Sequence, residues 1–291
     1  MGLAPAVQTV APVGGVVPDH ESSTSLLQAW DPVERTLLVP LVARALGHRW
    51  HLDALLPDTS AERVLEQLGW QDSIWSPDPV TLALILWRTQ TLCAWALTHF
   101  EQHPKALGLN VGAGLSDYFQ WLDNGSNRWL DTDLACVVQV RSRCLPDRAH
   151  AQSLALDVCE DHWWSQVERH LRARHEPMWI MLEGVLIYLS PQQVQRLLAT
   201  VGEHAPAGSS LAFDVIPRWM VGWPIRVPLA AAQQAEFQWG IDTTDQLESL
   251  HGRLHVEQVE SSPAPWIGWP WMGSVGWNAC SPYALVRMSV T

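Results

Sequence analysis

Two glycines stand at the end of an apolar run near the middle of the chain. Residues 106–111 read Ala-Leu-Gly-Leu-Asn-Val and are followed by Gly112, Ala113 and Gly114. A turn without side chains lets a ligand approach the backbone, as nucleotide cofactors do beyond a buried parallel strand. The fuller dinucleotide fingerprint needs a third glycine, which is missing around Phe119. An ordinary tight turn therefore remains the alternative interpretation.

Acidic residues follow two later apolar runs. Asp133 ends residues 128–133, where a carboxylate accepts hydrogen bonds from both hydroxyls of a ribose, and Asp131 is its competitor two positions earlier. Leu156 and Asp157 follow residues 151–155. At that place an aspartate can hold an adenine amino group while a leucine covers the ring. Alternatively, Asp133 would cap a helix that starts at its neighbour, and Asp157 would be a solvated cap.

Glu183 and Arg88 carry charges that need partners. Glu183 directly follows the apolar run at 178–182, and after it come Gly184 and a second apolar run at 185–189. A buried carboxylate is costly unless it is paired, and a cationic cofactor group or a local arginine would serve. Arg88 lies inside a long apolar segment, where its planar guanidinium could bind a carboxylate through two parallel hydrogen bonds. A surface arginine that extends its charge into water is the alternative.

A parallel sheet would bring these residues together. The short apolar runs predict strands, and the segments with helical spacing predict helices between those strands. Neighbouring parallel strands require crossover connections of this kind. The alternation therefore predicts a doubly wound α/β fold with the candidate residues beyond the carboxyl ends of its strands. The predicted strands are 106–111, 128–133, 151–155, 178–182 and 211–215, with closing antiparallel strands at 254–259 and 283–290; the predicted helices are 26–47, 60–68, 79–103, 134–140 and 191–204.

The order of these elements predicts one domain with three parts. Residues 1–25, rich in small residues and proline, form a flexible N-terminal arm. Within the domain, 26–291, we expect a helical cover (26–104), a cofactor-binding core (105–216), and a lid insertion with closing strands (217–291). Tryptophans gather in the last part and would line an apolar acceptor pocket or simply pack the core. They are Trp219, Trp223, Trp239, Trp266, Trp269, Trp271 and Trp277.

Composition narrows the class of protein. The 18 Lys and Arg against 30 Asp and Glu give a net charge of −12, which disfavours nucleic acid and anionic membranes as partners. The five cysteines form no CxxC pair, so neither a disulfide framework nor a metal site is indicated, and a reducing cytoplasm fits best. We see no signal peptide and no run approaching a membrane-spanning helix.

Taken in order, these segments resemble the leucine carboxyl methyltransferase family, in particular its polyketide O-methyltransferase branch, over roughly residues 26–262. After Leu115 the family commonly continues Asp-Thr-Arg-Phe, whereas this chain has Ser116, Asp117, Tyr118 and Phe119. The segments that carry the resemblance are 36–41, Arg88-Thr89, 109–115, 128–134, 183–189, Phe213-Asp214 and 239–242.

The resemblance implies a Rossmann-like class I methyltransferase fold with an N-terminal helical cover and a lid insertion after the fifth strand. It also implies S-adenosylmethionine as cofactor and S-adenosylhomocysteine as product. Arg88 would hold the cofactor's carboxylate, with Arg44 as a second candidate, and Glu183 would lie near its amino group. Gly112 and Gly114 would approach its amino-acid part. Asp133 would bind the ribose, and Leu156 and Asp157 would flank the adenine.

We therefore expect an O-methyltransferase acting on a hydroxyl, enol or carboxyl of a polyketide or polyketide-peptide intermediate, free or carrier-bound. A hydroxyl or enol acceptor benefits from a general base, for which Tyr188 and Asp214 are the candidates beyond strand ends. Three alternatives stay open: a protein C-terminal carboxyl methyltransferase, an NAD-dependent oxidoreductase, because the glycine turn and acidic strand end suit dinucleotides equally well, and a non-catalytic binding module.

Overall fold

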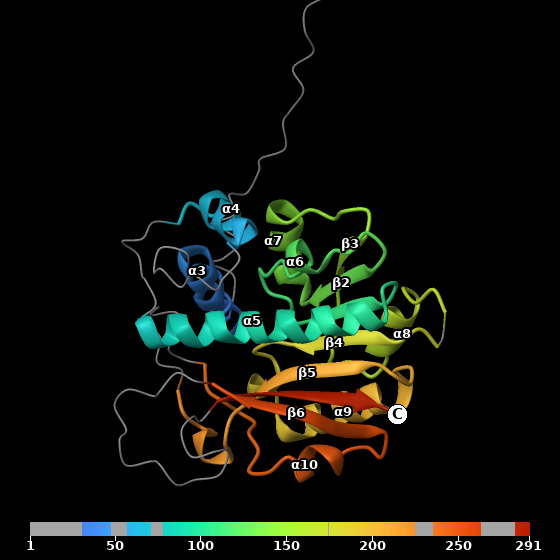
Figure 1. Cartoon of the computed structure of the whole chain (residues 1–291). Coiled ribbons are helices and arrows are strands. Elements are labelled where there is room, and N and C mark those ends of the chain that lie inside the picture. Colours follow the sequence, from blue (N-terminus) through green and yellow to red (C-terminus); the bar gives the residue numbers. More distant parts are fainter. Residues whose placement is uncertain (1–30, 48–56, 71–77, 174, 225–234, 263–282) are drawn as a thin grey trace, which may run out of the picture.

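A seven-stranded sheet forms the centre of the protein in a computed structural model that describes residues 31–47, 57–70, 78–173, 175–224, 235–262 and 283–291. The strand order is β3-β2-β1-β4-β5-β7-β6 (Figure 1). The first five strands are parallel and β7 runs antiparallel to both β5 and β6. Their bounds are β1 Leu107–Val111, β2 Arg128–Asp133, β3 Ala151–Ala155, β4 Met178–Leu182, β5 Ser210–Val215, β6 Leu254–Ser261 and β7 Ala284–Val290.

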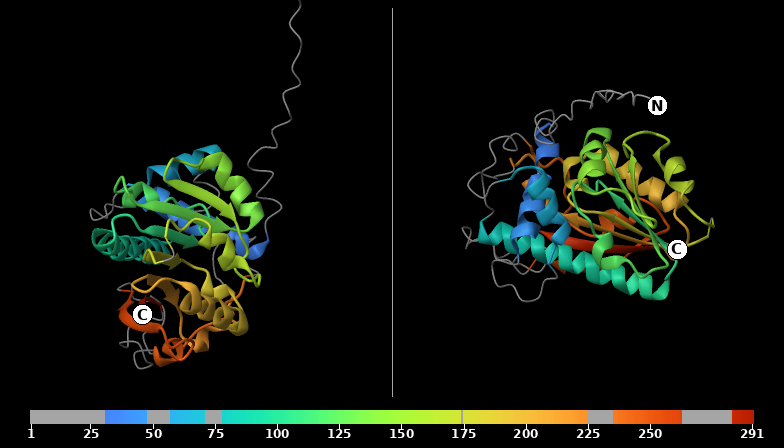
Figure 2. Two further views of the ribbon diagram at one scale, coloured as in Figure 1. Left: turned by 90° about the vertical axis from the view of Figure 1, so that its right-hand side faces the viewer. Right: turned by 90° about the horizontal axis from the view of Figure 1, so that it is seen from above.

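The central strands are apolar on both faces because helices cover both. In β4, Ile180 and its neighbours at alternate positions pack with the α8 and α9 side, while Trp179 and Met181 pack with α5. Figure 2 shows α5 and α9 on opposite sides of the sheet. A strand buried on both sides reads as a continuous apolar run, which is why these strands could be recognised in the sequence. The helices are α5 Pro79–Gln102, α6 Phe119–Leu122, α7 Ala135–Cys144, α8 Trp163–Glu168, α9 Pro191–His204 and α10 Asp245–Glu248.

The helical cover begins with two short helices instead of the single predicted one. Helix α2, Pro32–Arg35, starts at a capping box formed by Asp31 and Glu34. Helix α3, Leu38–Leu46, follows after a turn at Thr36 and Leu37, and α4 spans Thr59–Gln67. Pro40 explains the break, because a proline ring collides with the carbonyl four residues earlier and is tolerated only in a first helical turn. The expected helix over 26–47 is thus wrong in its continuity, and residues 26–30 lie outside the described part.

The insertion after β5 folds back and packs against the loop that follows β4. The 3-10 turn η3, Arg218–Met220, opens it, and a short bridge then pairs Pro224 with Glu236. Gln238 N donates to the carbonyl oxygen of Ile187 at 2.8 Å, in the 3-10 turn η2, Leu186–Tyr188. The insertion predicted after the fifth strand is therefore present. The predicted arm, 1–25, and Trp266, Trp269, Trp271 and Trp277 lie outside the described residues.

Helix α5 is long and apolar enough to cross a membrane by length and composition alone, contrary to our expectation that no run approaches this size. Half of its most apolar window is buried within the protein, where Trp95 and Phe100 pack against the sheet. This is the pattern of a core helix. The expectation of a cytoplasmic location stays a prediction.

His99 of α5 provides a pH-sensitive group in the core. It is 5% exposed, its Nδ1 lies 3.1 Å from Ser210 Oγ, and His103 and Arg287 lie nearby. Burial, reinforced by these neighbours, lowers the pKa of His99 to about 3. Because the unfolded chain binds the proton near pH 6.5 and the folded protein does not, stability is lost as the pH falls below 6.5.

We expect this histidine to lower the free energy of unfolding by about 2 kcal/mol between pH 7 and pH 5. Urea denaturation of the wild type and of His99→Gln at both pH values measures the contribution as the difference between their pH dependences. Equal pH dependence in the two proteins would show that His99 is not neutral and buried as described.

Candidate functional site

A cavity of about 270 Å³ opens at the carboxyl ends of β1 to β4. It brings together Gly112, Asp133, Leu156 and Asp157, four of the predicted cofactor-binding residues, from the ends of three different strands. The remaining walls come from the cover, from the start of α7 and from the loops after β3 and β4: Val33, Glu34, Thr36, Leu37, Val111, Leu134, Val137, Val158, Cys159, Gly184, Val185, Tyr188 and Leu189. The fold thus gathers these residues as the strand-end argument predicts.

Both glycines of the turn after β1 adopt conformations that favour glycine. Gly112 has φ 65°, and a Cβ there would lie 2.4 Å from Val185 Cγ2. Gly114 has φ 53°, and a Cβ there would lie 2.8 Å from Leu37 Cδ2. The turn is therefore packed tightly between the β4 loop and the cover. No helix N-terminus follows directly, since α6 begins only at Phe119 and has four residues.

A buried arginine fixes the glycine turn from behind. Arg141 of α7 donates from Nη1 to the carbonyl oxygens of Gly114 and Ser116, at 2.7 and 2.8 Å. Its Nη2 pairs with Asp131 at 2.6 Å, and Asp131 also accepts from Asn110 and Trp129. All hydrogen bonds of Asp131 thus serve the protein interior. Of the two aspartates of β2, only Asp133 lines this cavity, and its role with a ribose stays a prediction.

Asp133 is oriented by two backbone donors. Gly114 N donates to Oδ2 and Leu134 N to Oδ1, both at 2.7 Å. Burial raises the pKa of the carboxyl above its ordinary value, while these two hydrogen bonds favour the ionised form. Since each carboxylate oxygen can accept more than one hydrogen bond, Asp133 can receive a diol without losing its backbone partners.

The loop after β3 supplies the apolar and acidic end of the cavity. Leu156 is 5% exposed, and its N donates to the carbonyl oxygen of Asp133 at 2.8 Å. Asp157 Oδ1 accepts from Cys159 N at 2.8 Å and so closes a local turn, but Asp157 caps no helix, because the next one, α8, begins at Trp163 with His162 as its N-cap. Both Leu156 and Asp157 line the cavity, and a ligand role for Asp157 stays a prediction.

Glu183 and Arg88 pair with each other at the end of β4. Arg88 Nε lies 2.7 Å from Glu183 Oε1, and Arg88 Nη1 donates to Tyr283 Oη at 2.9 Å. The second oxygen of Glu183 accepts from Tyr118 Oη at 2.9 Å. Burial opposes ionisation, but the Arg88 guanidinium, with help from Arg44, holds the pKa of Glu183 below its ordinary range. Of the two partners considered for Glu183, the local arginine is the one seen.

Arg44 belongs to the same charged neighbourhood. It is 5% exposed in α3, and its Nε pairs with Asp58 Oδ2 at 3.0 Å. Its charge also favours ionisation of Glu183. The cover therefore supplies a second cation near the end of β4. Its suggested role with the cofactor carboxylate stays a prediction.

The two predicted general bases occupy different surroundings. Tyr188 lines the cavity, stacks on Phe237 with ring centroids 6.2 Å apart, and is hydrogen-bonded to Thr36; burial raises its pKa to about 12. It is therefore a neutral phenol at pH 7. Asp214 is fully buried, and its Oδ1 accepts from Gly184 N at 2.5 Å. Burial raises the pKa of Asp214 as well. This hydrogen bond supports the β4 turn, and a role as base stays a prediction for both residues.

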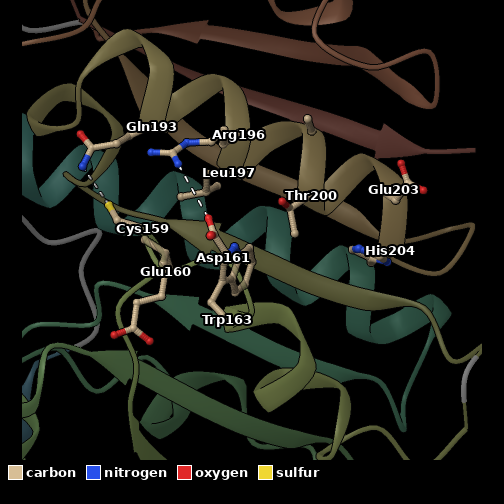
Figure 3. A pocket seen from close by; sticks show the side chains of 12 residues that line it. Cys159, Glu160, Asp161, Trp163, Gln193, Arg196, Leu197, Thr200, Glu203 and His204 are labelled. Carbon is tan, nitrogen blue, oxygen red and sulfur yellow. Dashed lines mark hydrogen bonds and ion pairs between the residues drawn. The ribbon is translucent and has the colours of Figure 1, made fainter.

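A second cavity, of about 360 Å³, lies between the loop after β3 and helix α9 (Figure 3). Gln193 and Arg196 point from α9 toward Cys159 and Asp161, with contacts of 3.2 and 3.8 Å. This cavity shares Val158 and Cys159 with the first but contains neither a glycine turn nor any predicted site residue. We therefore place the candidate cofactor site in the first cavity. Within the described ranges, no group of three or more His, Cys, Asp or Glu side chains is arranged to hold a metal ion.

Sequence reasoning missed three residues of the site. Tyr118, Arg141 and Tyr283 are buried and hold Glu183, the glycine turn and Arg88, respectively. None follows a predicted strand, which was the signal used to select candidates. The departure of this chain from the family at residues 116–119 did point to the segment of Tyr118.

Comparison with known proteins confirms the resemblance inferred from the motifs. Residues 109–202 match the family model described as leucine carboxyl methyltransferase. The chain is 29% identical over 237 residues to the tetracenomycin polyketide synthesis O-methyltransferase TcmP of Streptomyces glaucescens, covering 81% of this chain and 85% of that protein. The segment that matches the family model, residues 109–202, includes the glycine turn, Asp133 and Glu183. The family match supports S-adenosylmethionine as the cofactor, as the sequence predicted.

Solved structures show the same fold. A candidate methyltransferase from Thermobifida fusca YX is similar with a TM-score of 0.55 at 15% identity, covering 87% of this chain and 94% of that one. A DUF574 family protein from Streptomyces avermitilis MA-4680 is similar with a TM-score of 0.51 at 12% identity, covering 86% and 97%. These likenesses, with the strand order, confirm the Rossmann-like class I methyltransferase fold.

Proposed function

We propose that this S-adenosylmethionine-dependent methyltransferase methylates an oxygen of a small natural-product intermediate, a polyketide or polyketide-peptide that is free or carrier-bound. The observation that carries the proposal is the single cavity in which Gly112, Asp133, Leu156 and Asp157 meet. The relative TcmP is named for O-methylation in polyketide synthesis, which supports the choice of acceptor class.

The residues present fit the cofactor. Asp133 would accept from the ribose hydroxyls, and Leu156 and Asp157 would border the adenine at the end of the same cavity. Gly112 lines this cavity and Gly114 lies two residues beyond it. Arg88 and Glu183 pair with each other and are not among the residues that line the cavity; they would offer opposite charges to the zwitterionic amino-acid part. S-adenosylmethionine would supply an electrophilic methyl group on a sulfonium.

An aromatic wall beside the cavity supports an apolar acceptor. Tyr188 stacks on Phe237, Trp87 meets Tyr283 edge to face, and Trp219 lies in the same cluster. Most of these rings are half-buried, and they come from the helical cover, the core and the insertion with its closing strands. Half-buried aromatic side chains are typical of small-molecule pockets with few polar groups. An extended apolar intermediate fits such a wall better than a charged protein tail.

Methyl transfer from a sulfonium is an in-line displacement, so the protein chiefly aligns donor and acceptor and excludes water. Such alignment can contribute roughly 7–11 kcal/mol to lowering the barrier. A carboxylate acceptor is already ionised at pH 7, whereas a hydroxyl must lose a proton. Tyr188 is a neutral phenol at this pH, so it would act there as a hydrogen-bond donor or acceptor toward the acceptor oxygen.

Calorimetric titration with S-adenosylhomocysteine and, in parallel, with NAD tests the cofactor assignment. We expect saturable binding of S-adenosylhomocysteine alone. Binding of NAD alone would support the oxidoreductase alternative, and binding of neither would remove the basis of the proposal.

Transfer of labelled methyl from S-adenosylmethionine then tests the acceptor. Small phenols and carboxylic acids are compared with a peptide that ends in a free carboxylate. We expect label in the small acceptors. Label in the peptide alone would favour a protein C-terminal carboxyl methyltransferase, and tight cofactor binding without transfer to any acceptor would favour a non-catalytic module.

A further inference from the structure

The Glu183 carboxylate is held by side chains from two separate elements. Arg88 of α5 binds Oε1 at 2.7 Å, and Tyr118, the residue before α6, donates to Oε2 at 2.9 Å. The three side chains are almost completely buried: Tyr118 is fully buried, and the side chains of Arg88 and Glu183 are 11% and 7% exposed. Each carboxylate oxygen thus has a different protein partner, which fixes the plane of the carboxylate.

We propose that Tyr118 is a positioning residue that orients Glu183 to receive the ammonium group of the cofactor's amino-acid part. The inference rests on the proposed function, because it takes Glu183 as the group that meets this ammonium. Tyr118 itself does not touch the cofactor. Its hydroxyl acts through Glu183.

The position of Tyr118 links two parts of the site. It lies four residues beyond Gly114, on the segment whose backbone Arg141 anchors through the carbonyl oxygens of Gly114 and Ser116. Its ring meets Trp121 edge to face at 5.9 Å, inside the cluster that joins α5 and α6 to the sheet. A hydrogen bond from this rigid segment to Glu183 therefore sets the end of β4 relative to the glycine turn.

The chemistry of the pair suits a positioning role. Burial, together with the neighbouring Glu183 charge, raises the pKa of Tyr118 well above its ordinary value, so the phenol stays a donor at neutral pH. With Arg88 alone, the carboxylate could rotate about its ion pair. Both oxygens keep further acceptor capacity after accepting from Arg88 and Tyr118, so an added ammonium can bind without breaking either contact.

The test compares two ligands on Tyr118→Phe, which removes the hydroxyl and keeps the ring. S-adenosylhomocysteine carries the amino-acid part, and 5′-methylthioadenosine shares the adenosine but lacks that part. We expect calorimetry to show about a tenfold weaker affinity for S-adenosylhomocysteine, because a carboxylate no longer held by Tyr118 must be ordered when it binds the ammonium, and ordering one side chain costs up to about tenfold in affinity. The affinity for 5′-methylthioadenosine should be unchanged.

Ser209→Ala is the matched control. Its Oγ accepts from Met178 N at 2.9 Å in a fully buried position at the start of β4, the opposite end of the sheet. We expect this variant to bind both ligands as the wild type does, even if it melts at a lower temperature.

The outcomes separate the inference from the proposed function. Unchanged binding of S-adenosylhomocysteine by Tyr118→Phe would overturn the inference, and so would an equal loss for both ligands, because a merely structural role affects both alike. Wild-type protein that binds neither ligand would instead overturn the proposed function, and the inference with it.

Discussion

Glu183→Gln is expected to lower the free energy of unfolding by about 3–5 kcal/mol, because it leaves the Arg88 cation buried without its carboxylate. Arg88 is only 11% exposed in its side chain and reaches Glu183 at 2.7 Å. Burial lowers the pKa of Arg88, but Glu183, Tyr283 and Asp214 raise it more strongly. The pKa therefore lies well above its ordinary value. Although the variant lacks the Glu183 charge, a guanidinium stays protonated at neutral pH in any surroundings, so Arg88 cannot relieve the loss by giving up its proton.

The pH dependence gives the same pair a second signature. The folded pKa of Glu183 lies below its ordinary value, so its stabilising contribution is present above the unfolded pKa and is lost as the pH falls through the folded one. Urea denaturation at pH 7 and at pH 3 should show this loss in the wild type and a smaller one in Glu183→Gln.

Arg88→Met combined with Glu183→Met separates stability from binding. Replacing both charges by apolar side chains of similar length should restore most of the free energy of unfolding, because a buried ion pair contributes little net stability over apolar packing. It should not restore affinity for S-adenosylhomocysteine. A Glu183→Gln variant as stable as the wild type would show that the ion pair is not buried as described.

The sequence was sufficient for the sheet because its signal is local. The bounds expected for β2, β3 and β4 agree with the observed ones, and those for β1, β5, β6 and β7 differ by one or two residues at an end. These strands are apolar on both faces or alternate at the edge, patterns that need no knowledge of distant contacts. The cover was harder, since the break at Thr36 depends on the single proline at position 40.

Local sequence patterns predicted only some of the residues of the site. Gly112, Asp133, Leu156 and Asp157 could be selected because each directly follows a strand, and the parallel sheet brings such positions to one edge. Tyr118 and Tyr283 reach the end of β4 from segments 65 residues before Glu183 and 195 residues after Arg88. Which partner a buried charge finds at such separations is decided by packing, which no pattern in a single sequence displays.

Asp133→Asn is expected to weaken the affinity for S-adenosylhomocysteine by about a hundredfold. The ionised carboxylate would lose its charge-assisted hydrogen bonds to two ribose hydroxyls, each worth about 1.5–3 kcal/mol. The amide would also present an N–H group to Gly114 N or Leu134 N, both of which now donate to Asp133. Isothermal calorimetry measures the change directly.

Asp131→Asn is the matched control, because it makes the same substitution two residues earlier on the same strand. Asp131 pairs with buried Arg141 at 2.6 Å and does not line the cavity, so its loss should reduce the free energy of unfolding more than Asp133→Asn does. Its effect on affinity should stay below tenfold, because Arg141 can still hold the carbonyl oxygens of Gly114 and Ser116. The two variants should therefore rank in opposite order for stability and for binding. If Asp131→Asn instead lost more affinity than Asp133→Asn, Asp131 and not Asp133 would be the residue that binds the ribose. The cofactor would then lie on the other side of the glycine turn.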